Sequence, residues 1–386
     1  MRRYQLNRRG FLLATGSALL APAIVHAADE PIRLGSVLST TGPAAWLGDP
    51  EDKTLRMYVE EINKNGGVLG RKLQLFIYDD GSDAAKANSF GKRLIQQDNV
   101  DVILGAATTG TSLALVPLVE AAKVCLMSFG AARVLIDPVR PYVFKIPHSD
   151  TMAVQAVLGE MKSRGFRKIA LISDTGGFGK SGRTETMKVA QQLGLTLTIN
   201  ESFGERDTDM TPLLTHVKQS DAEALLMIST GQAPAIIARN YKQLDLKLPL
   251  YTTHSQASYE FIRIAGPASE GIRMPTPALL LADSLPANDP QKKVTTNYKN
   301  AFEAKYKIDV STFGGYAYDG LMIVVDAIKR AKSTEKAKLH QAIEQTRGFV
   351  GVSGIFTYSP TDHEGLDTSA FHMVEVKNGK FVEYKI

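Results

Sequence analysis

The chain contains very little cysteine, and this limits how it can be stabilised. Cys125 is the only cysteine among 386 residues, so no disulfide can form within the chain. It lies inside the apolar run Val124–Met127, which is typical of a packed core residue and not of a reactive thiol. With 44% hydrophobic residues, the chain is long enough to bury two cores of ordinary domain size.

The chain also lacks an apolar run long enough to span a membrane. The uncharged stretch Gly10–Val25 is too short and includes glycine, serine, threonine and proline. It ends at Val25-His26-Ala27 and is preceded by four arginines, Arg2, Arg3, Arg8 and Arg9. This pattern predicts an export signal over residues 1–27 and a periplasmic mature protein. Because Asn7–Leu12 fits the twin-arginine consensus, both that route and the general secretory route stay open.

There is no strong net charge outside this segment. The formal charge of +5 includes the four arginines of the predicted signal, so the rest of the chain is nearly neutral. A basic surface for nucleic acid is therefore not expected.

Catalytic motifs are also scarce. The chain has no G-x-S-x-G or H-E-x-x-H motif, and its histidines lack metal-ligand spacing. One G-x-G-x-x-G motif, Gly177–Gly182, follows an apolar run at Ile169–Ser173, with Glu201 about twenty residues further on. That is the pattern of a nicotinamide enzyme, but glycines are equally expected where backbone approaches a solute. Because this unit also lies behind a predicted export signal, we expect neither an enzyme nor a cofactor.

Strand and helix patterns alternate along the chain. Ile32–Leu38 predicts a strand, Asp49-Pro50 the start of a helix, and Lys72–Tyr78 the next strand. Small ligands bind at the carboxyl ends of such strands, and here the intervening loop contains Trp46 and Leu47. The pattern continues with predicted helices at 84–97 and 111–122 and strands at 100–105 and 124–129.

A second alternating series follows Tyr142–Pro147, with strands predicted at 168–174, 195–203, 222–230 and 248–254. The proline-rich stretch Met274–Pro290 predicts a linker, and long helices at 291–306 and 315–332 return to the first lobe. The tail predicts strands around an Asn378-Gly379 hairpin. The fold is thus α/β, with two doubly wound lobes joined by crossing hinge segments. Lobe 1 is expected to comprise residues 28–147 and 276–355, and lobe 2 residues 148–275 and 356–386.

Short motifs in a fixed order carry a family resemblance. They are Gly42-Pro43 with Gly48-Asp49, Ile62-Asn63 with Gly66-Gly67 and Gly70, Tyr78-Asp79-Asp80, the threonine-rich loop after Val102–Gly105, and Ile264-Ala265-Gly266 with Glu270-Gly271. From Ile32 onward the chain resembles the leucine/isoleucine/valine-binding type of periplasmic substrate-binding protein, in the type I periplasmic binding protein family. The resemblance implies a two-lobed clamp that closes on a small solute and docks on the membrane permease of an ABC importer.

The threonine loop is the first candidate ligand site. Thr108 and Thr109 follow a strand and open a helix, where free backbone N–H groups and hydroxyls suit a carboxylate. Thr109 matches the family position that binds a carboxylate, although both threonines would also serve as helix caps. Ala131 and Arg133 match further contact positions. Arginine departs from the small hydroxylated residue usual there, and it either adds donors for an acid or points to solvent.

Aromatic residues are the next candidates. Phe178 matches the residue of the second lobe that closes over the ligand, and Phe313 matches another apolar wall, although both are also ordinary core residues. Gln232 follows a strand and is expected to face the cleft on topology alone.

His254 is the most informative departure from the family. It occupies the position where amino-acid-binding members place an acid for the ligand ammonium, unless the alignment slips and brings Glu260 there. Burying an ammonium without a carboxylate is costly, so we expect a small carboxylate, an aromatic or branched acid, without an α-amine. Binding of branched-chain or other amino acids is the alternative. An exported ligand sensor is a further alternative to a monomeric receptor feeding an ABC permease.

Overall fold

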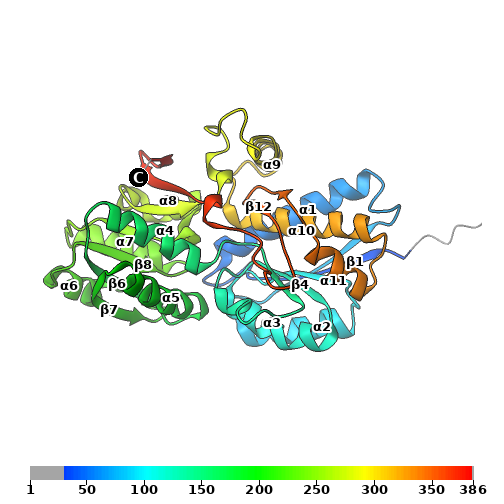
Figure 1. Ribbon diagram of the computed structural model, residues 1–386, viewed down its shortest axis with the longest axis horizontal. Coiled ribbons are helices and arrows are strands. Elements are labelled where there is room, and N and C mark those ends of the chain that lie inside the picture. Colours follow the sequence, from blue (N-terminus) through cyan, green and yellow to red (C-terminus); the bar gives the residue numbers. More distant parts are fainter. Residues whose placement is uncertain (1–29, 385–386) are drawn as a thin grey trace, which may run out of the picture.

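The computed structural model describes residues 30–384, which form two lobes lying side by side (Figure 1). The predicted export signal lies outside the described residues. Within residues 30–384, no helix combines the length and the apolar character needed to cross a membrane.

The first lobe contains a parallel sheet of five strands in the order β2-β1-β3-β4-β5. The interior strand β1 pairs along its whole length with β2 and along part of it with β3, which is why its residues are almost all buried. The strands are β1 (Ile32–Leu38), β2 (Leu73–Asp79), β3 (Val102–Gly105), β4 (Cys125–Ser128) and β5 (Val143–Lys145).

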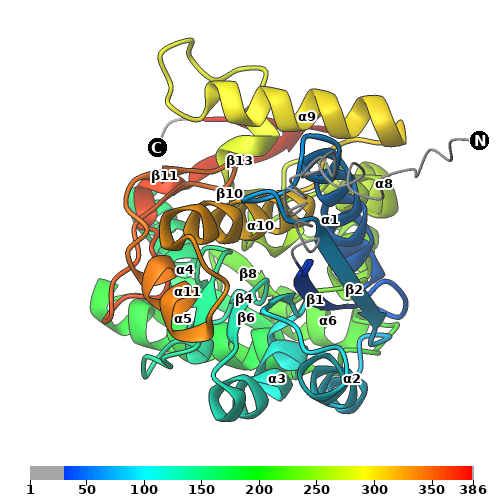
Figure 2. The same ribbon diagram turned by 90° about the vertical axis from the view of Figure 1, so that its right-hand side faces the viewer.

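Helices from two distant parts of the chain cover this sheet. The helix α1 packs along α10, so the two lie side by side although more than 240 residues separate them (Figure 2). The helices are α1 (Ala45–Lys64), α2 (Ala84–Gln96), α3 (Thr109–Ala122), α9 (Lys292–Tyr306), α10 (Thr312–Ala331) and α11 (Lys336–Glu344), with a short pair β11 (Phe349–Val350) and β12 (Ile355–Phe356).

The second lobe contains a sheet of seven strands in the order β14-β13-β10-β9-β8-β6-β7. Its strands are β6 (Lys168–Asp174), β7 (Thr196–Phe203), β8 (Ala224–Ile228), β9 (Leu250–Thr252), β10 (Arg273–Thr276), β13 (His372–Lys377) and β14 (Lys380–Glu383), of which β13 and β14 run antiparallel to their neighbours. Its helices are α4 (Asp150–Ser163), α5 (Gly177–Leu193), α6 (Thr211–Gln219), α7 (Ala233–Gln243) and α8 (Tyr259–Ala265). Single 3₁₀ turns are η1 (Arg133–Leu135), η2 (His254–Gln256), η3 (Gly266–Ser269), η4 (Ala278–Leu281) and η5 (Thr368–Ala370).

The chain crosses between the sheets after β5, after β10 and before β13. A buried ion pair connects the first and third of these crossings. Lys145 is fully buried and its ammonium lies 3.2 Å from a carboxylate oxygen of Glu364, which also accepts the Ser149 N–H at 2.7 Å. The backbone N–H of Lys145 donates to the His363 carbonyl at 2.9 Å. A buried ammonium needs such a partner, so separating these segments is costly.

Two expectations differ from the observed elements. α1 begins at Ala45, before Asp49-Pro50, because the turn at Gly42 already supplies its first hydrogen bond, from the Ala45 N–H to the Gly42 carbonyl. The proline therefore lies inside the helix. The predicted linker also begins as a strand, since Arg273–Thr276 forms β10 between β9 and β13 despite Pro275. The strands at 32–38 and 168–174 occur as predicted.

Gly48 is expected to be needed for the start of α1. A Cβ there would lie inside contact distance of the backbone of Ser39, whereas a Cβ at Gly159 in α4 would meet no atom within 4 Å. Gly48→Ala should lower the free energy of unfolding by about 1–3 kcal/mol through steric overlap. Gly159→Ala should raise it by about 0.5–1 kcal/mol through helix propensity. Urea denaturation measures both, and equal effects of the two changes would contradict this packing.

Candidate functional site

A small cavity lies between the two lobes, where the carboxyl ends of both sheets face each other. Its volume is about 20 Å³, room for little more than a water molecule, so the lobes are closed around it. It is lined by Leu47, Ala107, Thr108, Thr109, Phe129, Gly130, Ala131, Pro147, Phe178, Thr230, His254, Ser255, Phe313 and Tyr316. None of these residues is acidic, lysine or arginine.

The first turns of four helices reach this cavity. Leu47 is the third residue of α1, Thr109 the first of α3, Phe178 the second of α5 and Phe313 the second of α10. Helix N-termini carry unsatisfied N–H groups and a partial positive charge. The cavity thus combines an electropositive environment with uncharged side chains, which is suited to an anion.

The two threonines of the first lobe have different roles. Thr108 is the N-cap of α3, and its side chain forms a reciprocal capping box with Thr111. The capping function considered for this loop therefore applies to Thr108. The hydroxyl oxygen of Thr109 accepts the Ala132 N–H at 3.3 Å, which leaves its own O–H able to donate to a ligand.

His254 lies on the opposite side of the cavity, in η2. Its ring is 2% exposed and packs edge-on against Phe178, with centroids 6.1 Å apart. Neither ring nitrogen has a hydrogen-bond partner within residues 30–384; the backbone of His148 approaches the ring without reaching hydrogen-bond geometry. Burial, with a smaller effect of the Lys145 ammonium, lowers the pKa of His254 to about 3, so the imidazole is neutral.

A local hydrogen-bond network holds η2 in this position. The Ser255 hydroxyl and the Gln256 side-chain amide both donate to the Ser229 carbonyl at the end of β8, at 2.8 and 2.9 Å. One strand further, the Asp174 carboxylate accepts the N–H groups of Gly176 and Thr230. The loops that carry Phe178 and His254 are therefore fixed by buried polar contacts.

Seven of the residues predicted for the site line this cavity: Leu47, Thr108, Thr109, Ala131, Phe178, His254 and Phe313. Trp46 and Gln232 instead line a larger groove of about 940 Å³ between the lobes. Trp46 packs there against Phe261 and Phe313, with ring centroids 6.5 and 6.0 Å away.

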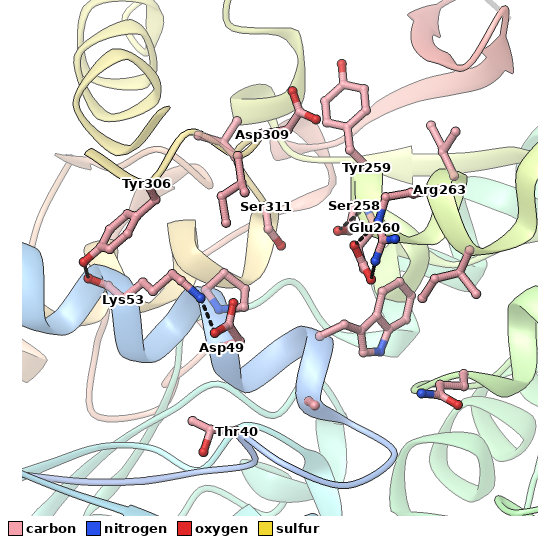
Figure 3. A pocket seen from close by; sticks show the side chains of 18 of the residues that line it. Thr40, Asp49, Lys53, Ser258, Tyr259, Glu260, Arg263, Tyr306, Asp309 and Ser311 are labelled. Atoms are coloured by element: carbon pink, nitrogen blue, oxygen red, sulfur yellow. Dashed lines mark hydrogen bonds and ion pairs between the residues drawn. The ribbon is translucent and has the colours of Figure 1, made fainter. Parts of the chain in front are cut away.

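Arg133 and Glu260 also lie outside the cavity. The Arg133 guanidinium pairs with Asp137 at 3.1 Å and approaches Glu364 at 3.6 Å, so it does not extend into the cavity. Glu260 lines the larger groove and pairs with Arg263, opposite Asp49 and Lys53 on α1 (Figure 3). Glu260 therefore does not supply an acid to the cavity.

The sequence did not identify Tyr316, which is 1% exposed and lines the cavity. Its hydroxyl has no hydrogen-bond partner in the described part of the chain. Its spacing of three residues from Phe313 places both on one face of α10, and this helical spacing was the available signal. Thr230, Ser255 and Phe129 were also not identified.

Comparisons with known proteins agree with this architecture. A family model described as periplasmic binding protein matches residues 31–380. The leucine-, isoleucine-, valine-, threonine- and alanine-binding protein of Pseudomonas aeruginosa is 24% identical over 97% of this chain and 94% of its own length. Leu/Ile/Val-binding protein homolog 3 of Brucella melitensis is 26% identical over 96% of this chain and 98% of its own length.

Solved structures show the same fold. An extracellular ligand-binding receptor from Rhodopseudomonas palustris HaA2 superposes with a TM-score of 0.86 and 26% identity, covering 92% of this chain and 99% of the receptor. The branched-chain amino acid transporter substrate binding protein LivJ from Streptococcus pneumoniae, solved with isoleucine, gives 0.81 and 23%, covering 91% and 97%. The fold and site define a two-lobed binding protein. The chain belongs to the periplasmic binding protein family.

Replacing His254 with glutamine should make stability less sensitive to acid. An unfolded histidine titrates near about 6.5, whereas burial holds the pKa of His254 near about 3. Between these values the unfolded chain binds a proton that the folded chain does not. The free energy of unfolding therefore falls as pH decreases below about 6.5, by up to about 1.4 kcal/mol per pH unit. Above that pH the contribution is constant.

This prediction is measured by urea denaturation of the wild type and His254→Gln between about pH 7.5 and pH 5. From the neutral to the acid end of this range, the unfolding free energy of the wild type should fall more than that of His254→Gln. His216→Gln, at an exposed side chain on α6, is the matched histidine-to-glutamine control against which the change in His254→Gln is compared. Parallel pH profiles for the wild type and His254→Gln would contradict the buried neutral imidazole.

Proposed function

We propose that this protein is the periplasmic substrate-binding component of an ABC importer, acting as a monomer that delivers a small solute to an inner-membrane permease. Membership of the periplasmic binding protein family supports this proposal. So does the coverage of relatives along almost their whole length, including a transporter binding protein. Closure of the two lobes on the solute is the mechanism, because only the closed form contacts it from both sides.

We further propose that the solute is a small aromatic or branched carboxylate without an α-amine. The observation that carries this proposal is the composition of the cavity wall: four helix N-termini and no acidic side chain. A carboxylate would accept hydrogen bonds from the first turn of α3, the Thr109 hydroxyl and the first turn of α5. An ammonium would be buried there without a counter-charge.

The opposite end of the solute is proposed to meet His254 and Tyr316. A neutral imidazole offers one donor and one acceptor, and the tyrosine hydroxyl offers both functions. A 2-oxo or hydroxyl oxygen on the solute matches these groups without adding charge. Phe178, Phe313 and Leu47 would enclose its hydrocarbon part.

Amino-acid binding is the second candidate. It is favoured by the names of relatives, since the Pseudomonas aeruginosa protein binds leucine, isoleucine, valine, threonine and alanine and LivJ was solved with isoleucine. The two candidates differ in one group of the ligand, the α-amine. A regulatory sensor of the same fold would differ only in its partner.

Calorimetric titration distinguishes the two ligand classes. We expect 4-methyl-2-oxopentanoate to bind at least about tenfold more tightly than L-leucine, because the two share a carbon skeleton and only leucine buries an unpaired ammonium. The 2-oxo analogues of isoleucine and valine, and benzoate, complete the panel. Tighter binding of the three amino acids than of their 2-oxo analogues would exclude the amine-free proposal and support the second candidate.

Thr109→Val should separate ligand binding from helix capping. The variant loses a hydroxyl donor while keeping its shape, so binding of the 2-oxo acid should weaken by about 1–3 kcal/mol. Because the buried Ala132 N–H also loses its acceptor, the melting temperature falls too, and binding is therefore measured well below it. Thr108→Val is the matched control, and loss of the cap should cost it about 0.5–2 kcal/mol of stability. If Thr109→Val binds as the wild type does, the carboxylate is held elsewhere.

A further inference from the structure

The G-x-G-x-x-G motif at the start of α5 remains unexplained by a binding function alone. Two of its glycines serve packing inside the second lobe. A Cβ at Gly179 would overlap the backbone of Asp174, and one at Gly182 would lie 2.7 Å from the Ile228 side chain on β8. The acid twenty residues on, Glu201, lies 3.3 Å from His216 on α6. These two glycines thus let α5 pack closely on its own sheet.

Gly177 differs, because it faces the other lobe. A Cβ at this position would lie 3.0 Å from the backbone nitrogen of Gly110 and 3.2 Å from the Thr109 methyl carbon, both in the first turn of α3. Such distances are shorter than ordinary van der Waals contact. The obstacle is largely helix backbone, which cannot rotate away as a side chain can. The first turns of α3 and α5 therefore meet across the cleft at the distance that a glycine permits.

A second backbone contact closes the cleft on the same side. Gly231, after β8, adopts a φ of +70°, and a Cβ there would lie 2.9 Å from the Pro43 carbonyl oxygen of the first lobe. Gly231 and Gly177 both line a pocket of about 230 Å³ between the lobes, together with Thr109 and Phe178.

We propose that Gly177 determines how far the clamp closes. Without a side chain there, the two helix N-termini reach the separation at which both can contact one carboxylate and exclude water. A larger residue would stop the lobes short and admit water, which weakens the electrostatic attraction between N–H groups and anion. The inference rests on the proposed binding function, but it concerns closure and not the identity of the solute.

A cross-linking experiment tests closure without any ligand. In the double variant Pro43→Cys/Gly231→Cys, the two Cβ atoms of the closed form are 3.9 Å apart, a separation suited to a disulfide. The added Cβ at residue 231 itself approaches the carbonyl of residue 43, so every further change is compared with this double variant and not with the wild type. The native Cys125 is buried, and burial raises the pKa of its thiol, so it does not compete. The rate of disulfide formation in oxidised glutathione, followed by mass spectrometry after alkylation, then reports the closed population.

We expect Gly177→Val, added to this background, to slow cross-linking by about tenfold or more, and Gly177→Ala to slow it by a smaller factor. Gly110→Ala is the matched control. It adds the same methyl group to the opposing helix, but its Cβ would meet only the Thr108 hydroxyl, at 4.0 Å, so cross-linking should proceed at the background rate. If Gly177→Val does not fold, Gly177→Ala provides the test.

Cross-linking of folded Gly177→Ala and Gly177→Val at the background rate would overturn the proposal. The proposal would also be overturned if Gly110→Ala slowed cross-linking as much as Gly177→Ala does. Any added methyl group in the interface would then slow closure, and Gly177 would have no special role. Titration with 4-methyl-2-oxopentanoate and L-leucine is run in parallel on proteins without the added cysteines. A failure of the proposed ligand class appears only in those titrations, whereas a failure of the closure proposal appears in the cross-linking rates.

Discussion

The site depends on one constraint of parallel α/β architecture: a helix that follows a strand begins at the carboxyl end of that strand. Helix N-termini therefore gather at one edge of each sheet, and here the two lobes turn these edges towards each other. The first turns of α1, α3 and α5, which follow β1, β3 and β6, reach the same cavity, and the first turn of α10, which follows α9, reaches it as well. The positive potential there comes from backbone dipoles and not from lysine or arginine. Such dipoles are fixed by the fold, so they need little reorganisation when an anion binds.

Among the described residues, no acidic side chain lines this cavity, and two buried acids on the elements around it are held in ways that limit negative charge there. Burial, and secondarily the carboxylate of Asp80, raise the pKa of Glu51, one turn beyond Leu47, well above its ordinary value, which favours the uncharged form of this acid. Asp174 uses its carboxylate on the backbone of its own lobe. Burial lowers the pKa of His254, and Lys145, which lies on the first crossing segment, adds to that effect. The protein thus presents neutral hydrogen-bonding groups opposite the helix N-termini.

The sequence predicted the elements and the loops of this site better than the directions of individual side chains. Strand ends and helix starts depend on local patterns, and the family resemblance matched Thr109, Phe178 and His254 to positions around one cleft. The direction of Arg133 stayed open, because one of its two acidic partners, Glu364, lies on the third crossing segment, 231 residues away, while Asp137 lies only four residues away. The orientation of Trp46 likewise depends on Phe261 from the other lobe. Pairings of this kind are set by tertiary packing, which local periodicity does not encode.

Closure and recognition are coupled through the polar groups that closure buries. When the lobes meet, the nitrogens of His254 and the hydroxyl of Tyr316 lose water and find no protein partner within residues 30–384. Each such group destabilises the closed form by about 1–3 kcal/mol unless a solute supplies its hydrogen bond. A solute that fills the apolar space without matching these groups would therefore close the clamp less effectively than one that does. Selectivity in such a cleft arises from what closure leaves unpaired, and it is greatest when the lobes approach closely enough to exclude water.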